Sequence, residues 1–302
     1  MYDFNNRKIL DEYFVYHGSK EEREFFDAAI ISNRSRFNDN AHLPVIPVQT
    51  VDGWDFIENL NDINIGKEIN QILDDDNRQV IIINTNKNSS LDISSKNQKV
   101  IEIGSNSTSY INPINLPIYY PNNESEKDEG MCLKCDTMIY ICAMAQGGFE
   151  NLSPVQRAII DRCCILMYRN LVFNSNIKKE LTIEDFYTVL MSQTEKEAVE
   201  LAKSLEIFIT GKLKNYSQKT NIQTDKLTVF NINEEDPELQ EIHLVLLFDY
   251  IWHNIVGKNY GSGTYTYLYV DDIHILNSYL AFMKVREICK RGIINGLVTT
   301  LL

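Results

Sequence analysis

The stretch "YTYLYVDDIHIL", residues 265–276, is an apolar run that stops on two adjacent carboxylates, Asp271 and Asp272. In open parallel sheets, ligands bind beyond the carboxyl ends of the strands, so a buried strand here would deliver both acids to a place where a site is expected. The first carboxylate could then hold Mg²⁺ while the second orients a water molecule. The alternative is a strand end whose acids meet solvent or cap the next helix.

Strand and helix patterns alternate along most of the chain. The segments "RQVIIIN" (78–84) and "QKVIEIG" (98–104) carry the apolar pattern that is typical of parallel strands covered on both faces. Residues 130–220 read as helical throughout, and strand patterns return at "DKLTVFNI" (225–232). This order predicts an α/β fold with a mostly parallel, doubly wound sheet and an all-helical insertion.

The same patterns predict where the parts of the chain begin and end. The charged run "NESEKDEG" (123–130) is a plausible start for the helical insertion. The expected divisions are a lead segment at 1–45, a first part of the sheet domain at 46–129, the helical insertion at 130–220 and a second part of the sheet domain at 221–302.

Several expected helices carry signals at their ends. Ser153 stands at an N-cap position before a proline. Thr182 is a second expected N-cap, with Asp185 in the first turn of its helix. Gly211 is expected just after a helix, at the C′ position. The amphipathic stretch "SKEEREFFDAAI" (19–30) predicts a further helix, because a serine precedes acids in its first turn.

Composition limits the classes of function. The 302 residues carry a net charge of −13 and are 44% hydrophobic, which indicates a globular chain without a strongly basic surface. We therefore expect protein or nucleotide partners before DNA. The sequence shows no signal peptide and no apolar stretch of the roughly 18 residues that span a bilayer. It predicts a cytoplasmic protein, at most peripheral to a membrane complex.

The cysteines allow two interpretations. Cys132 and Cys135 form a C-x-x-C pair, but no second ligand pair follows at the spacing that a zinc site requires. The surrounding segment "MCLKCDTMIYICAMA" (131–145) has apolar residues at helical intervals, which favours thiols packed on a buried helix face. Metal or redox use remains the alternative.

Three histidines and a cluster of lysines could serve a function, but each also has a simpler structural explanation. His243, His253 and His274 lack evident acid partners at ligand spacing and are expected to be packed or exposed residues. A basic cluster around an aromatic residue could touch DNA or a neighbouring subunit, but a solvated helix end is the simpler interpretation; its members are Lys212, Lys214, Tyr216 and Lys219.

Taken together, several long segments resemble the conjugal-transfer ATPases of type IV secretion, the TraE/TrbE and VirB group. The segments stand in the same order and at similar spacings as in that family, and they include "SYINPINLP" (109–117), "ENLSPVQRAIIDRCCILMYRN" (150–170), "LTIEDFYTVL" (181–190), "LAKSLEIFITGKLKNYSQKTNI" (201–222), "KLTVFNI" (226–232), "LLFDYIWHNI" (246–255) and "YLYVDDIHIL" (267–276). The resemblance is strong over about 100–302 and weaker over 20–99.

The resemblance implies a RecA-like P-loop NTPase fold with an all-helical insertion. It implies that Asp271 and Asp272 correspond to the family's Walker B acids, with Asp271 the residue that would hold Mg²⁺. Arg286 falls near an arginine that the family places in the helix before the last strand. By the same resemblance, the partners would be other type IV secretion or conjugation components.

The phosphate-binding loop of that family is not intact here. The family pattern is G-x-x-x-x-G-K-[ST], whose backbone N–H groups cradle phosphates. In "ENLNDINIGKEINQIL" (58–73), Gly66 and Lys67 survive, but Asn61 stands at the first glycine and Glu68 at the hydroxyl residue. Since a charged hydrogen bond contributes roughly 1.5–3 kcal/mol, losing two or three contacts costs on the order of a thousandfold in affinity.

Three further departures point the same way. Asp272 replaces the glutamate that usually follows the first acid, and a catalytic group misplaced by about 1 Å can cost roughly a hundredfold. The segment "NTN" (84–86) stands where the family tends to carry an acidic motif, and Thr299 or Thr300 stands where it has a polar sensor, usually glutamine.

Two hypotheses follow, beside a third for which the sequence offers no positive sign, a binding module of unrelated activity on the same fold. The first is a degenerate ATPase-like protein that is impaired in ATP binding and hydrolysis, needs no cofactor and acts as a partner of an intact ATPase or as a remnant of a mobile element. The alternative is an active ATPase that energises transfer, binds ATP and Mg²⁺ through Lys67, Asp271 and Asp272, and completes its phosphate site in altered geometry or from another subunit. Either could form homo- or hetero-oligomers.

Overall fold

The structure is a computed structural model, and it forms two compact units. The sheet unit comprises 1–103, 223–245 and 259–302, and the helical unit comprises 104–222 and 246–258. The residues that the structure describes are 46–50, 53–57, 65–85, 98–116, 124–173, 180–259, 262–271, 276, 281, 284–289 and 296–301. The expected helix at 19–30 lies outside them.

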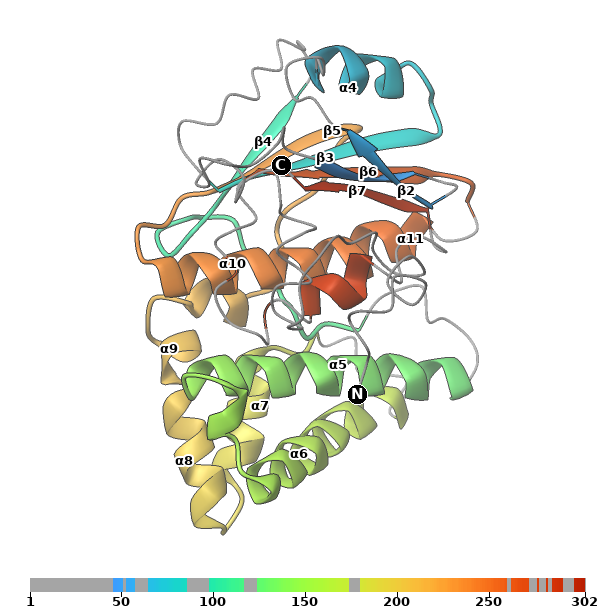
Figure 1. Cartoon of the computed structure of the whole chain (residues 1–302). Coiled ribbons are helices and arrows are strands. Elements are labelled where there is room, and N and C mark those ends of the chain that lie inside the picture. The colour runs from blue at the N-terminus through green and yellow to red at the C-terminus, as the bar shows by residue number, and fades with distance from the viewer. Residues whose placement is uncertain are drawn as a thin grey trace, which may run out of the picture. The chain divides into compact units, whose positions relative to one another are not determined.

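The sheet unit contains seven strands in the order β2-β1-β7-β6-β3-β5-β4 (Figure 1). Five of them, from β7 to β4, run parallel, which confirms the expected α/β class. The strands are β1 (Ile46–Thr50), β2 (Gly53–Ile57), β3 (Arg78–Asn84), β4 (Lys99–Ile103), β5 (Leu227–Ile232), β6 (Tyr265–Val270) and β7 (Leu297–Leu301).

Strand β3 lies at the centre of the parallel strands, between β5 and β6. Its four residues 80–83 are all fully buried, as expected for a strand covered on both faces. On one face, Ile69 and Ile72 of α4 (Ile65–Leu73) pack against Val80 and Ile82. Figure 1 shows α4 on one side of the sheet and the start of α10 (Pro237–Tyr250) on the other, so the sheet is doubly wound.

The two N-terminal strands form an antiparallel hairpin that the apolar pattern did not predict. Ile46 pairs with Ile57 and Thr50 with Gly53, and β1 then lies antiparallel to β7. In the sequence, "HLPVIPVQT" (42–50) indicates only an extended segment that two prolines interrupt. A turn signal was present in the sequence, because Asp52-Gly53 is a favoured hairpin dipeptide.

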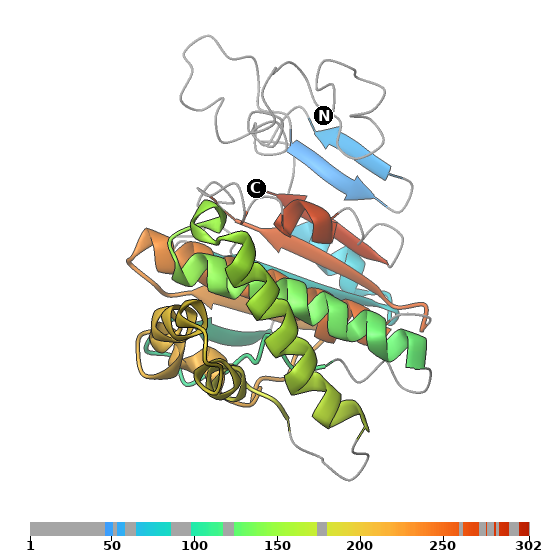
Figure 2. The same cartoon turned by 90° about the horizontal axis from the view of Figure 1, so that it is seen from below.

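The helical unit is wider than the 130–220 insertion expected from the sequence, since it begins at residue 104 and includes 246–258. Its helices α5 and α6 pack side by side, as both views show (Figures 1 and 2). The helical elements are α5 (Glu124–Ala145), η3 (Phe149–Asn151), α6 (Pro154–Phe173), α7 (Ile183–Met191), α8 (Lys196–Ser204), α9 (Glu206–Ile209), η4 (Lys214–Ser217), the π-helix η5 (Ile251–Val256) and α11 (Gly257–Asn259). No helix in the described ranges is long and apolar enough to cross a lipid bilayer.

The predicted starts of α6 and α7 are confirmed. At α6, the Gln156 backbone N–H donates to Ser153 Oγ at 3.1 Å, and the Ser153 backbone N–H donates to Gln156 Oε1 at 2.9 Å. This pair of bonds is a capping box. Thr182 and Asp185 form another at α7. Gly211 does follow a helix end, but not with a positive φ; a Cβ there would lie 2.7 Å from the Ile207 Cα, so the position has no room for a side chain.

A linker, residues 104–116, is tied to the helical unit by side chains that satisfy its backbone carbonyls. Asn215 Nδ2 donates to the carbonyls of Gly104 and Ser107 at 3.0 and 2.9 Å. Asn221 Nδ2 donates to the Thr108 carbonyl, and the Asn221 backbone N–H donates to the Tyr110 carbonyl. These bonds explain why the unit begins at 104 rather than near 130.

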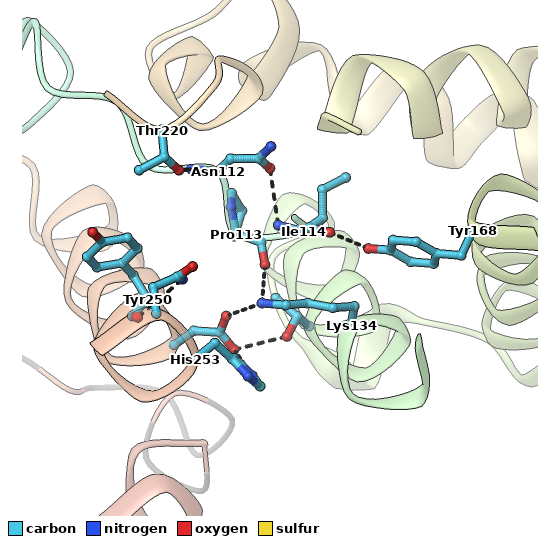
Figure 3. A network of polar contacts seen from close by, with 11 residues as sticks. Asn112, Pro113, Ile114, Lys134, Tyr168, Thr220, Tyr250 and His253 are labelled. Atoms are coloured by element: carbon cyan, nitrogen blue, oxygen red, sulfur yellow. Dashed lines mark hydrogen bonds and ion pairs between the residues drawn. The ribbon is translucent and has the colours of Figure 1, made fainter. Parts of the chain in front are cut away.

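The end of the linker meets a buried ion pair (Figure 3). Lys134 Nζ of α5 lies 3.1 Å from Asp249 Oδ2 of α10, and both side chains are 1% exposed. The ammonium also donates to the Pro113 carbonyl at 2.7 Å, while Thr137 Oγ1 donates to Asp249 Oδ1 at 3.0 Å. Nearby, the Tyr168 hydroxyl donates to the Ile114 carbonyl at 2.6 Å. The charges are thus surrounded by hydrogen-bond partners, as buried charges require.

The π-helix follows directly on the helix that carries Asp249. Within it, Asn254 Nδ2 donates to the Tyr250 carbonyl four residues earlier at 3.3 Å, and such a side-chain bond competes with the regular backbone ladder. The π-helix also contains His253, which is buried with its Nε2 3.6 Å from Asp249 Oδ1. The irregular turn therefore lies against the ion pair.

Removing one charge of the pair should destabilise the protein strongly. Lys134→Met leaves the Asp249 carboxylate buried without its cation, and we expect the free energy of unfolding to fall by about 3–5 kcal/mol. The double variant Lys134→Met/Asp249→Leu removes both charges and should lose less. Urea unfolding followed by far-UV circular dichroism measures both.

A matched control is Arg162→Met, which breaks the exposed pair between Arg162 and Glu195 in the same unit. Because solvent screens that pair, the change in unfolding free energy should be far smaller than for Lys134→Met. If Lys134→Met/Asp249→Leu were less stable than Lys134→Met alone, this account of the buried pair would be contradicted.

Candidate functional site

The backbone N–H and carbonyl of Asp271 are both hydrogen-bonded at the carboxyl end of β6. Its N–H donates to the Ile83 carbonyl at 2.9 Å, and its carbonyl accepts from Thr85 Oγ1 at 2.9 Å. Gln240 of α10 in turn donates from Nε2 to the Thr85 carbonyl at 2.7 Å. The half-buried acid therefore lies at the carboxyl edge of the parallel strands, where the sequence placed a candidate site.

A row of polar side chains crosses the neighbouring strands at the same edge. Asn84 of β3 is in register with Asn231 of β5, which is in register with Glu102 of β4. Because side chains alternate along a strand, Asn84 shares the face of Val80 and Ile82, which α4 covers. Asp271 follows the end of β6, two residues after Tyr269, which belongs to the same hydrophobic cluster as Val80 and Ile82.

The amides in this row are oriented in one direction. Asn231 Nδ2 donates to Glu102 Oε1 at 2.8 Å, and Asn84 Nδ2 donates to Asn231 Oδ1 at 3.0 Å. A carboxylate only accepts hydrogen bonds, so Glu102 fixes the orientation of Asn231, which then fixes that of Asn84. The end of β3 thus presents a neutral amide tied to its neighbours where the resembled family tends to carry an acid.

The predicted phosphate-binding residues are only partly described. Gly66 is the second residue of α4 and is half-buried. A short turn joins α4 to β3, so the first turn of the helix points toward the carboxyl edge of the sheet. The side chain of Lys67 and the whole of Asp272 lie outside the described residues. Their roles, and that of Asp271 as a Mg²⁺ ligand, stay predictions.

Two residues near the C-terminus are buried in the sheet unit. Thr299 pairs with Leu268 in the middle of β7 and is fully buried, so it does not lie at the strand ends as a sensor would. The side chain of Thr300, the other candidate, is not described. Arg286 is half-buried within 284–289 and its Nε is buried; its expected role also stays a prediction.

The cysteine side chains that the structure describes are buried, as expected for thiols on a packed helix face. Within the described residues, no cluster of three or more histidine, cysteine or acidic side chains could hold a metal ion. Cys135 and Cys164 hydrogen-bond to each other, and burial raises the pKa of the Cys164 thiol well above its usual value. It likewise raises the pKa of Cys289 to about 12. The described thiols are all buried and free: Cys135, Cys142, Cys163, Cys164 and Cys289.

Two histidines have acid partners, so the sequence-based expectation that they lack them was wrong. His243 Nε2 lies 3.5 Å from Glu234 Oε2, and His253 contacts Asp249. The second pair was visible in the sequence, because residues 249 and 253 are one helical turn apart. Both histidines are buried, as packed residues are; His274 lies outside the described residues.

The basic cluster at 212–219 does not offer an aromatic surface. Tyr216 is buried and lies edge-on to Phe208, with ring centroids 6.5 Å apart. A base could not stack on this ring without local unfolding, so the helix-end interpretation fits the structure better than DNA contact.

Comparison with known proteins identifies the fold. No model of a known protein family matches the sequence, and no curated protein matches it significantly. Among solved structures, VirB4 of Thermoanaerobacter pseudethanolicus is similar, with a TM-score of 0.58 and 15% sequence identity over 74% of this chain and 61% of the VirB4 chain. The chain thus spans less than two thirds of that protein. The likeness shows a shared α/β fold, consistent with the expected RecA-like P-loop architecture.

His243 gives the sheet unit a pH dependence of known sign. Burial lowers the pKa of His243 to about 4, against about 6.5 in an unfolded chain, although Glu234 opposes the shift. The unfolded state therefore binds a proton first as pH falls, and stability is lost between pH 6.5 and 4. Between pH 7 and 5 we expect about 2 kcal/mol of this loss to come from His243.

The measurement compares urea unfolding at pH 7 and pH 5 for the wild type and His243→Gln, which keeps a polar side chain without the titration. Other titrating groups are common to both proteins, so the difference between their pH slopes isolates His243. Equal slopes would show that this histidine is not buried in its neutral form.

Proposed function

We propose that this chain is a degenerate relative of the type IV secretion ATPases that retains the RecA-like scaffold and has lost tight nucleotide binding. The observation that carries the proposal is the combination at the carboxyl edge of the sheet. Asp271 keeps the position of a strand-end acid, while the adjacent strand ends in the tied amide of Asn84.

The residues present do not fit ATP and Mg²⁺ held in the usual P-loop mode. Asn61 and Glu68 occupy the glycine and hydroxyl positions, and a carboxylate at the start of a helix would face the phosphates. Asn84 supplies no charge to support a cation near Asp271. We therefore derive no step of ATP hydrolysis for this chain.

The proposed role is interaction without turnover. A chain that keeps the packed sheet and the helical unit could join an assembly of intact ATPases, as a homo- or hetero-oligomeric partner in a conjugation or secretion system. We propose a cytoplasmic position, peripheral to the membrane complex. A remnant encoded by a decaying mobile element would show the same residues, and DNA contact is not part of the proposal.

A nucleotide titration tests the proposal. We expect the full chain, titrated with a fluorescent ATP analogue and Mg²⁺, to show no saturation in the micromolar range. The expected affinity is on the order of a thousandfold weaker than that of an intact site, because two or three phosphate contacts are missing. An intact P-loop ATPase under the same conditions provides the positive control.

The variants Lys67→Ala and Asp271→Asn separate the two hypotheses. If the wild type binds with micromolar affinity and both variants lose it, the chain is an unusual ATPase and the degenerate interpretation fails. If the wild type and both variants give the same flat titration, the proposal stands. The same three proteins mixed with an intact partner ATPase test whether a second subunit completes the site.

A further inference from the structure

Helix α6 exposes apolar side chains along one side. The large ones are Val155 at 55%, Leu166 at 44% and Ile165 at 38% exposure, and Ala158 is exposed with them. The opposite side of α6 is buried in the helical unit, so apolar residues lie on both sides of the helix. A helix with this distribution is typically covered on both sides.

Three charged side chains of α6 are exposed on the same side: Asp161, Arg162 and Arg169. Arg162 already has a carboxylate, because its Nη2 lies 2.7 Å from Glu195 Oε1. The side chains of Asp161 and Arg169 make no ion pair with any residue that the structure describes. They are eight residues apart, about 12 Å along the helix axis, so they are too far apart to pair with each other. One acid and one base are therefore left for a partner.

Asp161, Ile165 and Arg169 form one row on the helix surface, which we name the α6 ridge. Side chains four residues apart line up in such rows, and all three of these are exposed. The ridge thus has an acid at one end, a base at the other and an apolar residue midway. Arg157, the preceding residue of the row, is half-buried and interacts elsewhere in the chain.

The order of charges on the α6 ridge is complementary to its own reverse. When two copies of the ridge lie antiparallel about a two-fold axis at Ile165, Asp161 of each copy faces Arg169 of the other. Each contact across a two-fold interface occurs twice, so both ends of both ridges are paired. Such rows pack into each other's grooves in the commonest helix–helix arrangement, with a crossing angle of about 50°.

We propose that two copies of this chain associate through the α6 ridge, antiparallel about Ile165. The net charge of −13 makes two copies repel in general, so association needs a face where opposite charges meet. A parallel arrangement would set each charge against its like and is disfavoured. The proposal deepens the oligomeric part of the proposed function. It does not depend on nucleotide binding, so the two can fail separately.

Sedimentation velocity of the full chain without nucleotide, at rising protein concentration, tests the dimer. We expect the wild type to pass from monomer to dimer. Asp161→Arg and Arg169→Asp should each weaken dimerisation about tenfold, because each turns two attractive contacts per dimer into two repulsive ones. An equal mixture of the two variants restores opposite charges at both ends of the ridge. The mixture should therefore dimerise about as well as the wild type.

The matched control is Glu184→Arg, which reverses an exposed acid of α7 in the same unit and should leave dimerisation unchanged. A wild type that stays monomeric at every concentration would overturn the proposal, and so would a dimer that neither α6 reversal weakens. A mixture that associates no better than its components would overturn the antiparallel register. If circular dichroism shows that a reversal variant is unfolded, Asp161→Asn and Arg169→Gln remove the same charges and should also weaken the dimer.

Discussion

Two opposite charges inside a helical core, Lys134 and Asp249, set a constraint that the surrounding chain has to meet. A buried ion pair is tolerated only when its remaining donors and acceptors also find partners. Those partners come from three separate stretches: the Pro113 carbonyl of the linker, the Thr137 hydroxyl of α5 and the π-helix that carries His253. The pair therefore fixes where the linker runs and how α5 meets the helix bearing Asp249.

At the carboxyl edge of the sheet, a strand-end acid lies next to a strand that ends in an amide. The Asp271 carbonyl accepts a hydrogen bond from Thr85 Oγ1, and Gln240 in turn donates to the Thr85 carbonyl. The neighbouring strand β3 ends in a neutral amide, Asn84, which is hydrogen-bonded to Asn231. A fold shared with VirB4 does not fix the chemistry at this edge, because one fold can carry different sites.

Most of the fold could be predicted because its signals are local. The strand Arg78–Asn84 was predicted to the residue, since apolar residues at successive positions mark it. The candidate site was predicted less completely. Asp271 was found because it ends an apolar run, but the row from Asn84 to Glu102 depends on the register of three strands that are distant in sequence. The Lys134–Asp249 contact, across 115 residues, had no local signal.

The buried thiols that the structure describes can report local unfolding of each unit. Four of them, Cys135, Cys142, Cys163 and Cys164, belong to the helical unit, and Cys289 belongs to the sheet unit. A buried, protonated thiol does not react with an alkylating reagent until its surroundings come apart. The rate at which each cysteine is alkylated therefore reports how often its own unit unfolds locally. Labelling of Cys289 alone would show that the sheet unit opens while the helical unit stays folded.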